Sequence, residues 1–245
     1  MLKLSLLRGG YLMTQRTKLG MLVGEFFGTA MLTSVVLAEA NSGVLVNRTW
    51  FVAASAGLTL ALLSLTIGRL SGAHVNPAIT IGMWTLRKIQ TTTAIVFIAA
   101  QVLGGAVALR LFQYFQDDVL QSAAGKFDWR VFVAEMIGTM VFSFGVAAVV
   151  TQKLDGYRAA FAVGTSLMLG AIIAGTASNG FLNPAVALGN NSWSWTYAAA
   201  PIAGAIVGMN IYDLFLAPEA SFKASVVSSP SKSVSSKKKS AKKKR

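Results

Sequence analysis

The sequence contains no cysteine and only one histidine, His74. Without cysteine the chain can form neither a disulfide bond nor a thiolate metal site. A single histidine provides no cluster of the nitrogen ligands that zinc prefers, so we expect no metal centre. Catalysis by a histidine base is disfavoured for the same reason, and the sequence contains no nucleophile–base pair or phosphate-binding loop. The composition therefore predicts a protein that is not an enzyme and that carries no cofactor.

Charged residues are also scarce. They make up 13% of the 245 residues, whereas 54% are hydrophobic and the mean hydropathy is +0.58. Soluble domains carry roughly a quarter charged residues, and runs of about 20 apolar residues match a hydrocarbon core of about 30 Å. Six such runs predict an all-α, multi-pass membrane protein; they cover Leu19–Ala38, Trp50–Ile67, Thr92–Leu109, Val131–Val150, Ala159–Gly175 and Trp195–Leu214.

The charges that are present predict the orientation in the membrane. Lysine and arginine favour cytoplasmic loops, and a cytoplasmic N-terminus places nine of them on that side before the tail is counted: Lys3, Arg8, Arg16, Lys18, Arg69, Arg87, Lys88, Lys153 and Arg158. Only four fall on or near the opposite side: Arg48, Arg110, Lys126 and Arg130. We therefore expect both termini in the cytoplasm, and a cell-membrane location.

The two ends of the chain differ from the membrane domain, which we place at residues 19–220. Residues 1–18 are expected to form a cytoplasmic segment, because "LSLL" is too short for the apolar core of a signal peptide. Residues 221–245 are rich in serine and lysine, which predicts a disordered tail. This tail either stays solvated and fixes the orientation or contacts anionic lipid headgroups. Nucleic acid is not an expected partner for a tail tethered to a membrane.

An internal repeat divides the domain into halves at about residues 19–113 and 130–216. "VGEFFGTAMLTSVVLA" matches "VAEMIGTMVFSFGVAA", which aligns Glu25 with Glu135. An Asn-Pro-Ala triplet follows in each half, beginning at Asn76 and at Asn183. Because each half has three spans, the second half must enter the membrane from the opposite side, which makes an inverted repeat.

Each triplet has the features of a helix start inside the membrane. Asparagine is a preferred N-cap, and proline is favoured at the first helical position. The segment "NPAITIGMWTL", which begins with the first triplet, has about ten helix-compatible residues, enough for roughly 15 Å. We therefore predict two re-entrant half-helices whose positive ends meet at the midplane. Their residues are Asn76-Pro77-Ala78 and Asn183-Pro184-Ala185.

The segments before the triplets, 68–75 and 177–182, are predicted to be re-entrant loops. Non-helical backbone at this depth is tolerated only where it is packed in protein or lines a wet cavity. Loop carbonyls would then accept hydrogen bonds from a passing solute, and the amides of Asn76 and Asn183 would donate them. The sequence thus predicts a narrow polar pore.

Over about residues 19–216 the chain resembles the aquaporin (major intrinsic protein) family. The resemblance rests on "SGAHVNPA", the paired triplets in an inverted repeat, and the glutamates of the first and fourth spans. It implies six tilted helices with two half-helices and a homotetramer with one pore per subunit. It also implies passive flow of water or small neutral solutes across the bilayer.

The resemblance implies structural roles for the buried ionisable residues. Glu25 and Glu135 would accept hydrogen bonds from the re-entrant loops; the alternatives are that they reach the headgroups or act as carboxylates of a proton-coupled carrier. His74 is expected to be a packed loop residue beside Asn76, with a pore-facing or pH-sensing histidine as the alternative.

The chain departs from the family pattern at the outer constriction. Typical members have an arginine directly after the second triplet, and this position is Val186. Counting from the triplets places Ala56, Ala171 and Gly180 at the other constriction positions, with Phe181 one residue away. These small residues predict a wide, uncharged constriction that lacks the arginine's barrier against cations.

We therefore predict a passive channel for water and small neutral solutes such as glycerol. One alternative is a mainly structural or junctional membrane protein with a residual pore. The other is a secondary transporter, a class that also uses inverted repeats.

Overall fold

The computed structural model describes residues 2–43, 47–122 and 125–217, with side chains from residue 17 onward. The predicted disordered tail, residues 221–245, lies outside the described residues. Within them, every regular element is a helix: α1 (Leu2–Ala40), α2 (Arg48–Thr66), α3 (Gly68–Ser71), α4 (Pro77–Thr85), α5 (Thr91–Gln116), α6 (Trp129–Thr151), α7 (Gly156–Ala174), α8 (Pro184–Gly189) and α9 (Trp195–Phe215).

Six of these helices are long and apolar enough to cross a membrane, which confirms the predicted number of spans. They are α1 from Thr17 onward, α2, α5, α6, α7 and α9. The helix α5 continues past the end of the apolar run at Leu109 as far as Gln116, and within this extension the Arg110 side chain donates to the Gln113 side chain at 3.3 Å. A charged residue ended the apolar run but did not end the helix.

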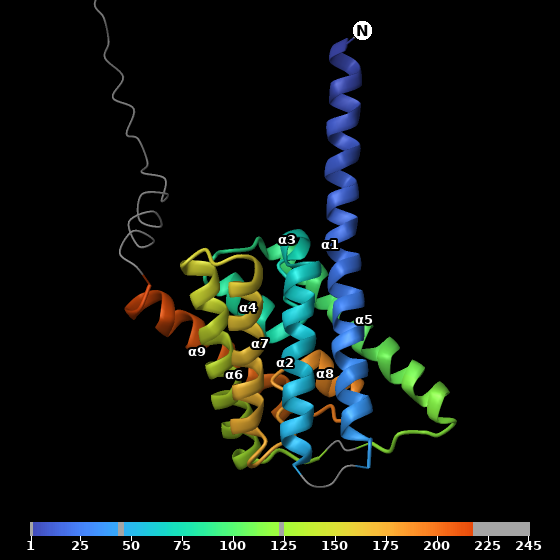
Figure 1. The fold of residues 1–245 in the computed structure, drawn as a ribbon, viewed down its shortest axis with the longest axis vertical. Coiled ribbons are helices and arrows are strands. Elements are labelled where there is room, and N and C mark those ends of the chain that lie inside the picture. Colours follow the sequence, from blue (N-terminus) through green and yellow to red (C-terminus); the bar gives the residue numbers. More distant parts are fainter. Residues whose placement is uncertain (1, 44–46, 123–124, 218–245) are drawn as a thin grey trace, which may run out of the picture.

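The two halves of the bundle have the same packing order. In the first half α1 packs against α5 and α2, and in the second half α6 packs against α9 and α7. The halves meet where α2 packs along α7, and each half-helix packs on the last helix of the other half, α4 on α9 and α8 on α5. Figure 1 shows α4 in the upper part of the bundle and α8 lower down, as expected for half-helices that enter from opposite sides.

The junction between α2 and α7 depends on a pair of glycines. A Cβ atom on Gly57 would lie 2.6 Å from the carbonyl oxygen of Gly164, and a Cβ on Gly164 would lie 2.6 Å from that of Gly57. Real Cβ atoms are not found so close to backbone oxygens, so only glycine lets the two helices approach to this distance.

The half-helices begin as the triplets predict. Asn76 and Asn183 are extended N-caps whose side-chain oxygens accept from the backbone N–H groups of Ala78 and Ala185 at 2.8 and 3.0 Å. A proline follows at the first helical position in each case. The first half-helix, α4, has nine residues, slightly fewer than the ten expected, and the second, α8, has six.

One predicted loop is partly helical. Residues 68–71 form the short helix α3, because backbone hydrogen bonds of 2.9–3.0 Å continue the helical pattern beyond the end of α2. The helix stops at Gly72, whose φ of 92° is left-handed and suits glycine. The non-helical part of the first re-entrant segment is therefore confined to residues 72–75.

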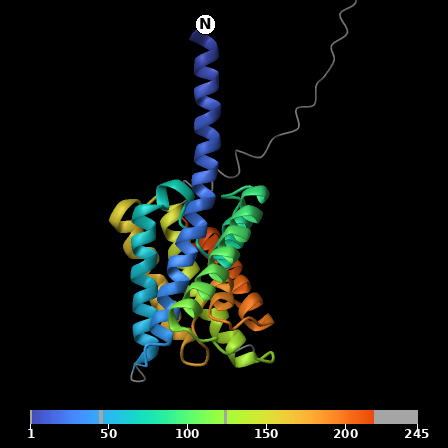
Figure 2. The same cartoon turned by 90° about the vertical axis from the view of Figure 1, so that its right-hand side faces the viewer.

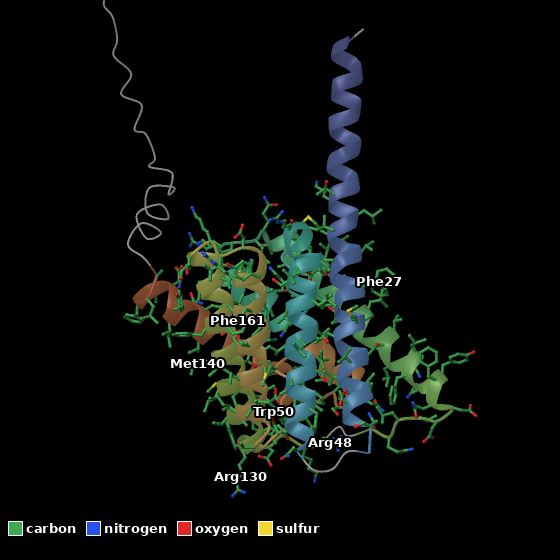
Figure 3. The ribbon with its side chains drawn as sticks, viewed as in Figure 1. Phe27, Arg48, Trp50, Arg130, Met140 and Phe161 are labelled. Atoms are coloured by element: carbon green, nitrogen blue, oxygen red, sulfur yellow. The ribbon has the colours of Figure 1, made fainter. Side chains whose placement is uncertain are left out.

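The N-terminal part of α1 continues as a helix well beyond the rest of the bundle (Figures 1 and 2). The faces that surround the bundle are apolar. Leu58, Phe27 and Phe161 are 73%, 64% and 71% exposed, as expected for side chains that face lipid rather than protein. Figure 3 marks Phe27 on α1 and Phe161 on α7.

Candidate functional site

Glu25 binds the first re-entrant segment with both carboxylate oxygens. Oε1 accepts from the Ser71 hydroxyl at 2.7 Å and from the His74 backbone N–H at 3.0 Å. Oε2 accepts from the Val75 backbone N–H and from the Gln101 side-chain amide, both at 2.7 Å. The carboxylate is fully buried, and its four hydrogen bonds replace the water that burial removes.

Glu135 binds the second re-entrant segment in the same way. Its Oε1 accepts from the Ser178 hydroxyl at 2.8 Å and from the Phe181 N–H at 3.1 Å. Its Oε2 accepts from the Leu182 N–H at 2.7 Å. The two glutamates that the repeat aligned are therefore equivalent in three dimensions, and neither reaches the ends of its helix.

The loop backbone presents these N–H groups because several of its residues adopt the left-handed conformation. The φ angles of Ala73 and Val75 are 49° and 41°, and those of Gly180 and Leu182 are 64° and 52°. Non-glycine residues in this region are strained, and such strain persists only when surrounding contacts hold it in place. The hydrogen bonds to Glu25 and Glu135 provide those contacts.

The two asparagines brace the two loops against each other. The side-chain nitrogen of Asn76 donates to the Leu182 carbonyl at 2.9 Å, and that of Asn183 donates to the Val75 carbonyl at 2.8 Å. Each carboxamide nitrogen has two N–H groups, so each retains one beyond this contact. Both asparagines line the cavity at the centre of the bundle.

Three cavities lie in sequence along the bundle. The central cavity has a volume of about 20 Å³. It shares Val36, Val52 and Phe181 with a cavity of about 360 Å³. It shares Leu60, His74 and Phe142 with another of about 400 Å³. We name the larger cavities the Arg48 vestibule and the Arg69 vestibule after an arginine in the lining of each.

The structure brings the four predicted constriction residues together. Ala56, Ala171, Gly180 and Val186 all line the central cavity, although they come from α2, α7, a re-entrant loop and α8. Phe181 lines it as well. The side chains of Ala56, Ala171 and Val186 are buried, which is consistent with the small free volume between them.

Sequence reasoning did not find the larger apolar residues of this lining. Leu32 and Phe142 both line the central cavity, and each lies seven residues after the buried glutamate of its own helix. Residues seven apart share a helix face, so the repeat together with this spacing contained the missing signal. Val36 lies one further turn along the same face of α1.

His74 packs against neighbouring side chains and also lines two of the cavities. Its ring Nδ1 lies 3.2 Å from the Thr80 hydroxyl, and the ring meets Phe97 edge-on with centroids 5.6 Å apart. It is 7% exposed and lies at the boundary of the central cavity and the Arg69 vestibule.

The repeat breaks at Gln101, which sequence reasoning also missed. Its amide donates to Glu25 and, at 2.9 Å, to Thr80, and it is fully buried. In the second half, Pro201 takes the place of Gln101 when "AAQVLGGAVA" is aligned with "AAPIAGAIVG". Ala187 takes the place of Thr80 when the two triplets are aligned, and neither side chain can form these hydrogen bonds. Glu135 accordingly has one side-chain donor fewer than Glu25.

No group of three or more histidine and carboxylate side chains that could hold a metal ion is present in the part of the chain that the structure describes. Six spans, two capped half-helices and a row of cavities through the centre define a helical membrane channel built as an inverted repeat.

Comparisons with known proteins agree with this class. The family model described as "Major intrinsic protein" matches residues 12–212. Nodulin-26 of Glycine max is 31% identical over 211 residues, covering 79% of this chain and 76% of the relative. Human aquaporin-1 is 28% identical over 222 residues, covering 81% and 82%. This chain belongs to the major intrinsic protein family, the aquaporins.

A solved structure shows the same fold. The aquaglyceroporin of Plasmodium falciparum superposes with a TM-score of 0.68 at 22% identity, covering 84% of this chain and 99% of that chain. The chain is thus a multi-pass integral membrane protein and a channel of the aquaporin family, whose members are not enzymes.

Proposed function

We propose that the protein is a passive channel for water and small neutral solutes such as glycerol, with an uncharged constriction beside the Arg48 vestibule. One observation carries the proposal: the central cavity shares lining residues with both vestibules and is lined by both asparagines, and its described lining contains no lysine, arginine, aspartate or glutamate. A solute crossing it meets hydrogen-bonding groups without a site that would trap an ion.

The asparagines are proposed to orient the solute at the midpoint. Each has one amide N–H beyond the contact with the opposite loop, and this N–H would donate to a water or hydroxyl oxygen. Glu25 and Glu135 act only through the loops, by holding their N–H groups away from the path. The positive ends of the half-helix dipoles then disfavour cations at the same point.

The constriction is proposed to be uncharged, and its size depends on more than its four small residues. Phe181, Val36 and Val52 border the same passage, and about 20 Å³ is room for roughly one or two water molecules at a time. We expect water to pass in single file and glycerol to pass only when the Phe181 side chain moves.

We further propose that the Arg48 vestibule faces outward and that both termini lie in the cytoplasm. The Arg69 vestibule contains Arg69 and Lys153, and basic residues favour the cytoplasmic side. We expect a homotetramer in the cell membrane, with one pore in each subunit.

The test is stopped-flow light scattering on vesicles that contain the purified protein. We expect higher osmotic water permeability with a low activation energy, and glycerol entry that is slower than water entry. Folded tetramers with no flux would favour the structural or junctional alternative. Saturable uptake that depends on a proton gradient would favour a secondary transporter, with Glu25 and Glu135 as its candidate carboxylates.

A further inference from the structure

Full charges are unevenly distributed along the path. The described lining of the central cavity contains no lysine, arginine, aspartate or glutamate. The Arg69 vestibule has both signs, with Arg69, Lys153 and Asp155. Among the described residues that line the Arg48 vestibule, Arg48 is the one charged side chain, and the polar others are amides and hydroxyls.

Arg48 begins the stripe of α2 that lines the whole passage. It is the first residue of α2, and Val52, Ala56 and Leu60 follow at intervals of four residues. Residues four apart lie on the same face of a helix. Val52 borders the Arg48 vestibule and the central cavity, Ala56 is a constriction residue, and Leu60 borders the Arg69 vestibule. Arg48 therefore lies on the pore-facing side of α2, at its entrance.

No described lining residue neutralises this charge. The acidic residues of the same end of the bundle, Glu39, Asp117, Asp118 and Asp128, do not line the Arg48 vestibule. A guanidinium stays charged at any physiological pH. The N-terminus of α2 adds the positive end of its own dipole at the same point.

Arg130 provides a natural comparison. It has the same charge and lies at the same end of the molecule as Arg48, as Figure 3 shows. It lines a separate groove of apolar character between α6 and α7, together with Trp129, Ile137 and Ile173. It is therefore a positive charge at the same end that does not border the path.

We propose that Arg48 is a specificity-determining residue that disfavours cations at this mouth, supplying from α2 the positive charge that Val186 does not provide. This inference rests on the proposed channel function. Because the vestibule is wide and lined mainly by polar side chains, the effect is moderate. One unit charge about 7 Å away in water lowers the local cation concentration by about threefold. Salt screens it, since the Debye length falls from about 30 Å at 0.01 M to about 3 Å at 1 M.

The experiment compares guanidinium with urea, two planar solutes of similar size that differ by one positive charge. Their uptake is measured in vesicles that contain the wild type, Arg48→Gln, Arg48→Glu, Arg48→Lys or Arg130→Gln. At about 0.01 M salt we expect the guanidinium-to-urea ratio to rise about threefold in Arg48→Gln and further in Arg48→Glu. It should keep the wild-type value in Arg48→Lys and Arg130→Gln, and the variants should converge at about 1 M salt.

The outcomes separate the two proposals. Urea entry in each variant reports an open pore, so a wild type without water or urea flux contradicts the channel function itself. Equal ratios in Arg48→Gln and wild type, with urea entry present, overturn the role of Arg48. An equal rise in Arg130→Gln also overturns it, because any surface charge would then suffice. Guanidinium excluded by every variant overturns it too, because the barrier would then lie deeper in the pore.

Discussion

At the residue scale, we propose that Val186 helps to set the space and the charge of the constriction. It is 2% exposed, lines the central cavity and follows the cap of α8. An arginine here would occupy more volume than the cavity leaves open, and no described lining residue is a carboxylate that could pair with it.

We predict that Val186→Arg lowers the ratio of glycerol to water permeability by about tenfold, which corresponds to about 1.4 kcal/mol in the barrier. The long side chain occupies the width that the larger solute needs, so the permeability to glycerol should fall more than the permeability to water. Both fluxes are measured in the same vesicles, and Val186→Gln is the control for length without charge. An unchanged ratio in a folded tetramer would mean that this position does not set the constriction, and Phe181 would then be the residue to substitute.

At the scale of elements, the two re-entrant loops are unequal copies. The first is held by a carboxylate with four donors, and the second by one with three. The second half thus shows that the side-chain donor of Gln101 is not needed to keep a loop in place, whereas the backbone donors occur in both halves.

We therefore predict different outcomes for Gln101→Leu and Glu25→Leu. Loss of Gln101 removes a hydrogen bond to a charged group, worth about 1.5–3 kcal/mol, so thermal stability should fall. Water flux should stay within about twofold of wild type, because Glu25 still accepts from Ser71, His74 and Val75. Glu25→Leu should abolish flux, since it frees the loop N–H groups at membrane depth. If Gln101→Leu also abolished flux while the tetramer stayed intact, the two loops would not be supported alike.

The elements also show what sequence could and could not provide. The spans followed from apolar runs, and the half-helices from the cap and proline chemistry of two triplets. The helical turn at residues 68–71 was missed because no apolar pattern marks a four-residue helix. Gln101 was missed because one polar residue in an apolar span has no period, and its partners lie 21 and 76 residues away in the chain. Leu32 and Phe142 could have been predicted as lining residues only by combining the internal repeat with the helical period.

At the scale of the whole molecule, the cysteine-free sequence makes the orientation directly testable. Gln121 lines the Arg48 vestibule and Asp155 lines the Arg69 vestibule, and both are exposed. A thiol placed at either position is the only one in the chain.

We predict that a membrane-impermeant thiol reagent labels Gln121→Cys in intact cells and labels Asp155→Cys only after permeabilisation. The reason is the excess of basic residues at the end of the bundle that holds Asp155. The unsubstituted protein is the control and should not be labelled on either side. The reverse pattern would place the termini outside the cell and contradict the proposed orientation.

The contacts between the asparagines and the opposite loops also bear on the order in which the molecule is made. Asn76 binds a carbonyl 106 residues later in the chain, and Asn183 binds one 108 residues earlier. Contacts so distant in sequence form late, because the intervening chain must be ordered first. During synthesis the first re-entrant loop is inserted while its partner, Leu182, has not yet been translated. The first half of the chain therefore cannot complete the centre of the bundle by itself, and we expect the protein to become permeable to solutes only after its second half has been inserted.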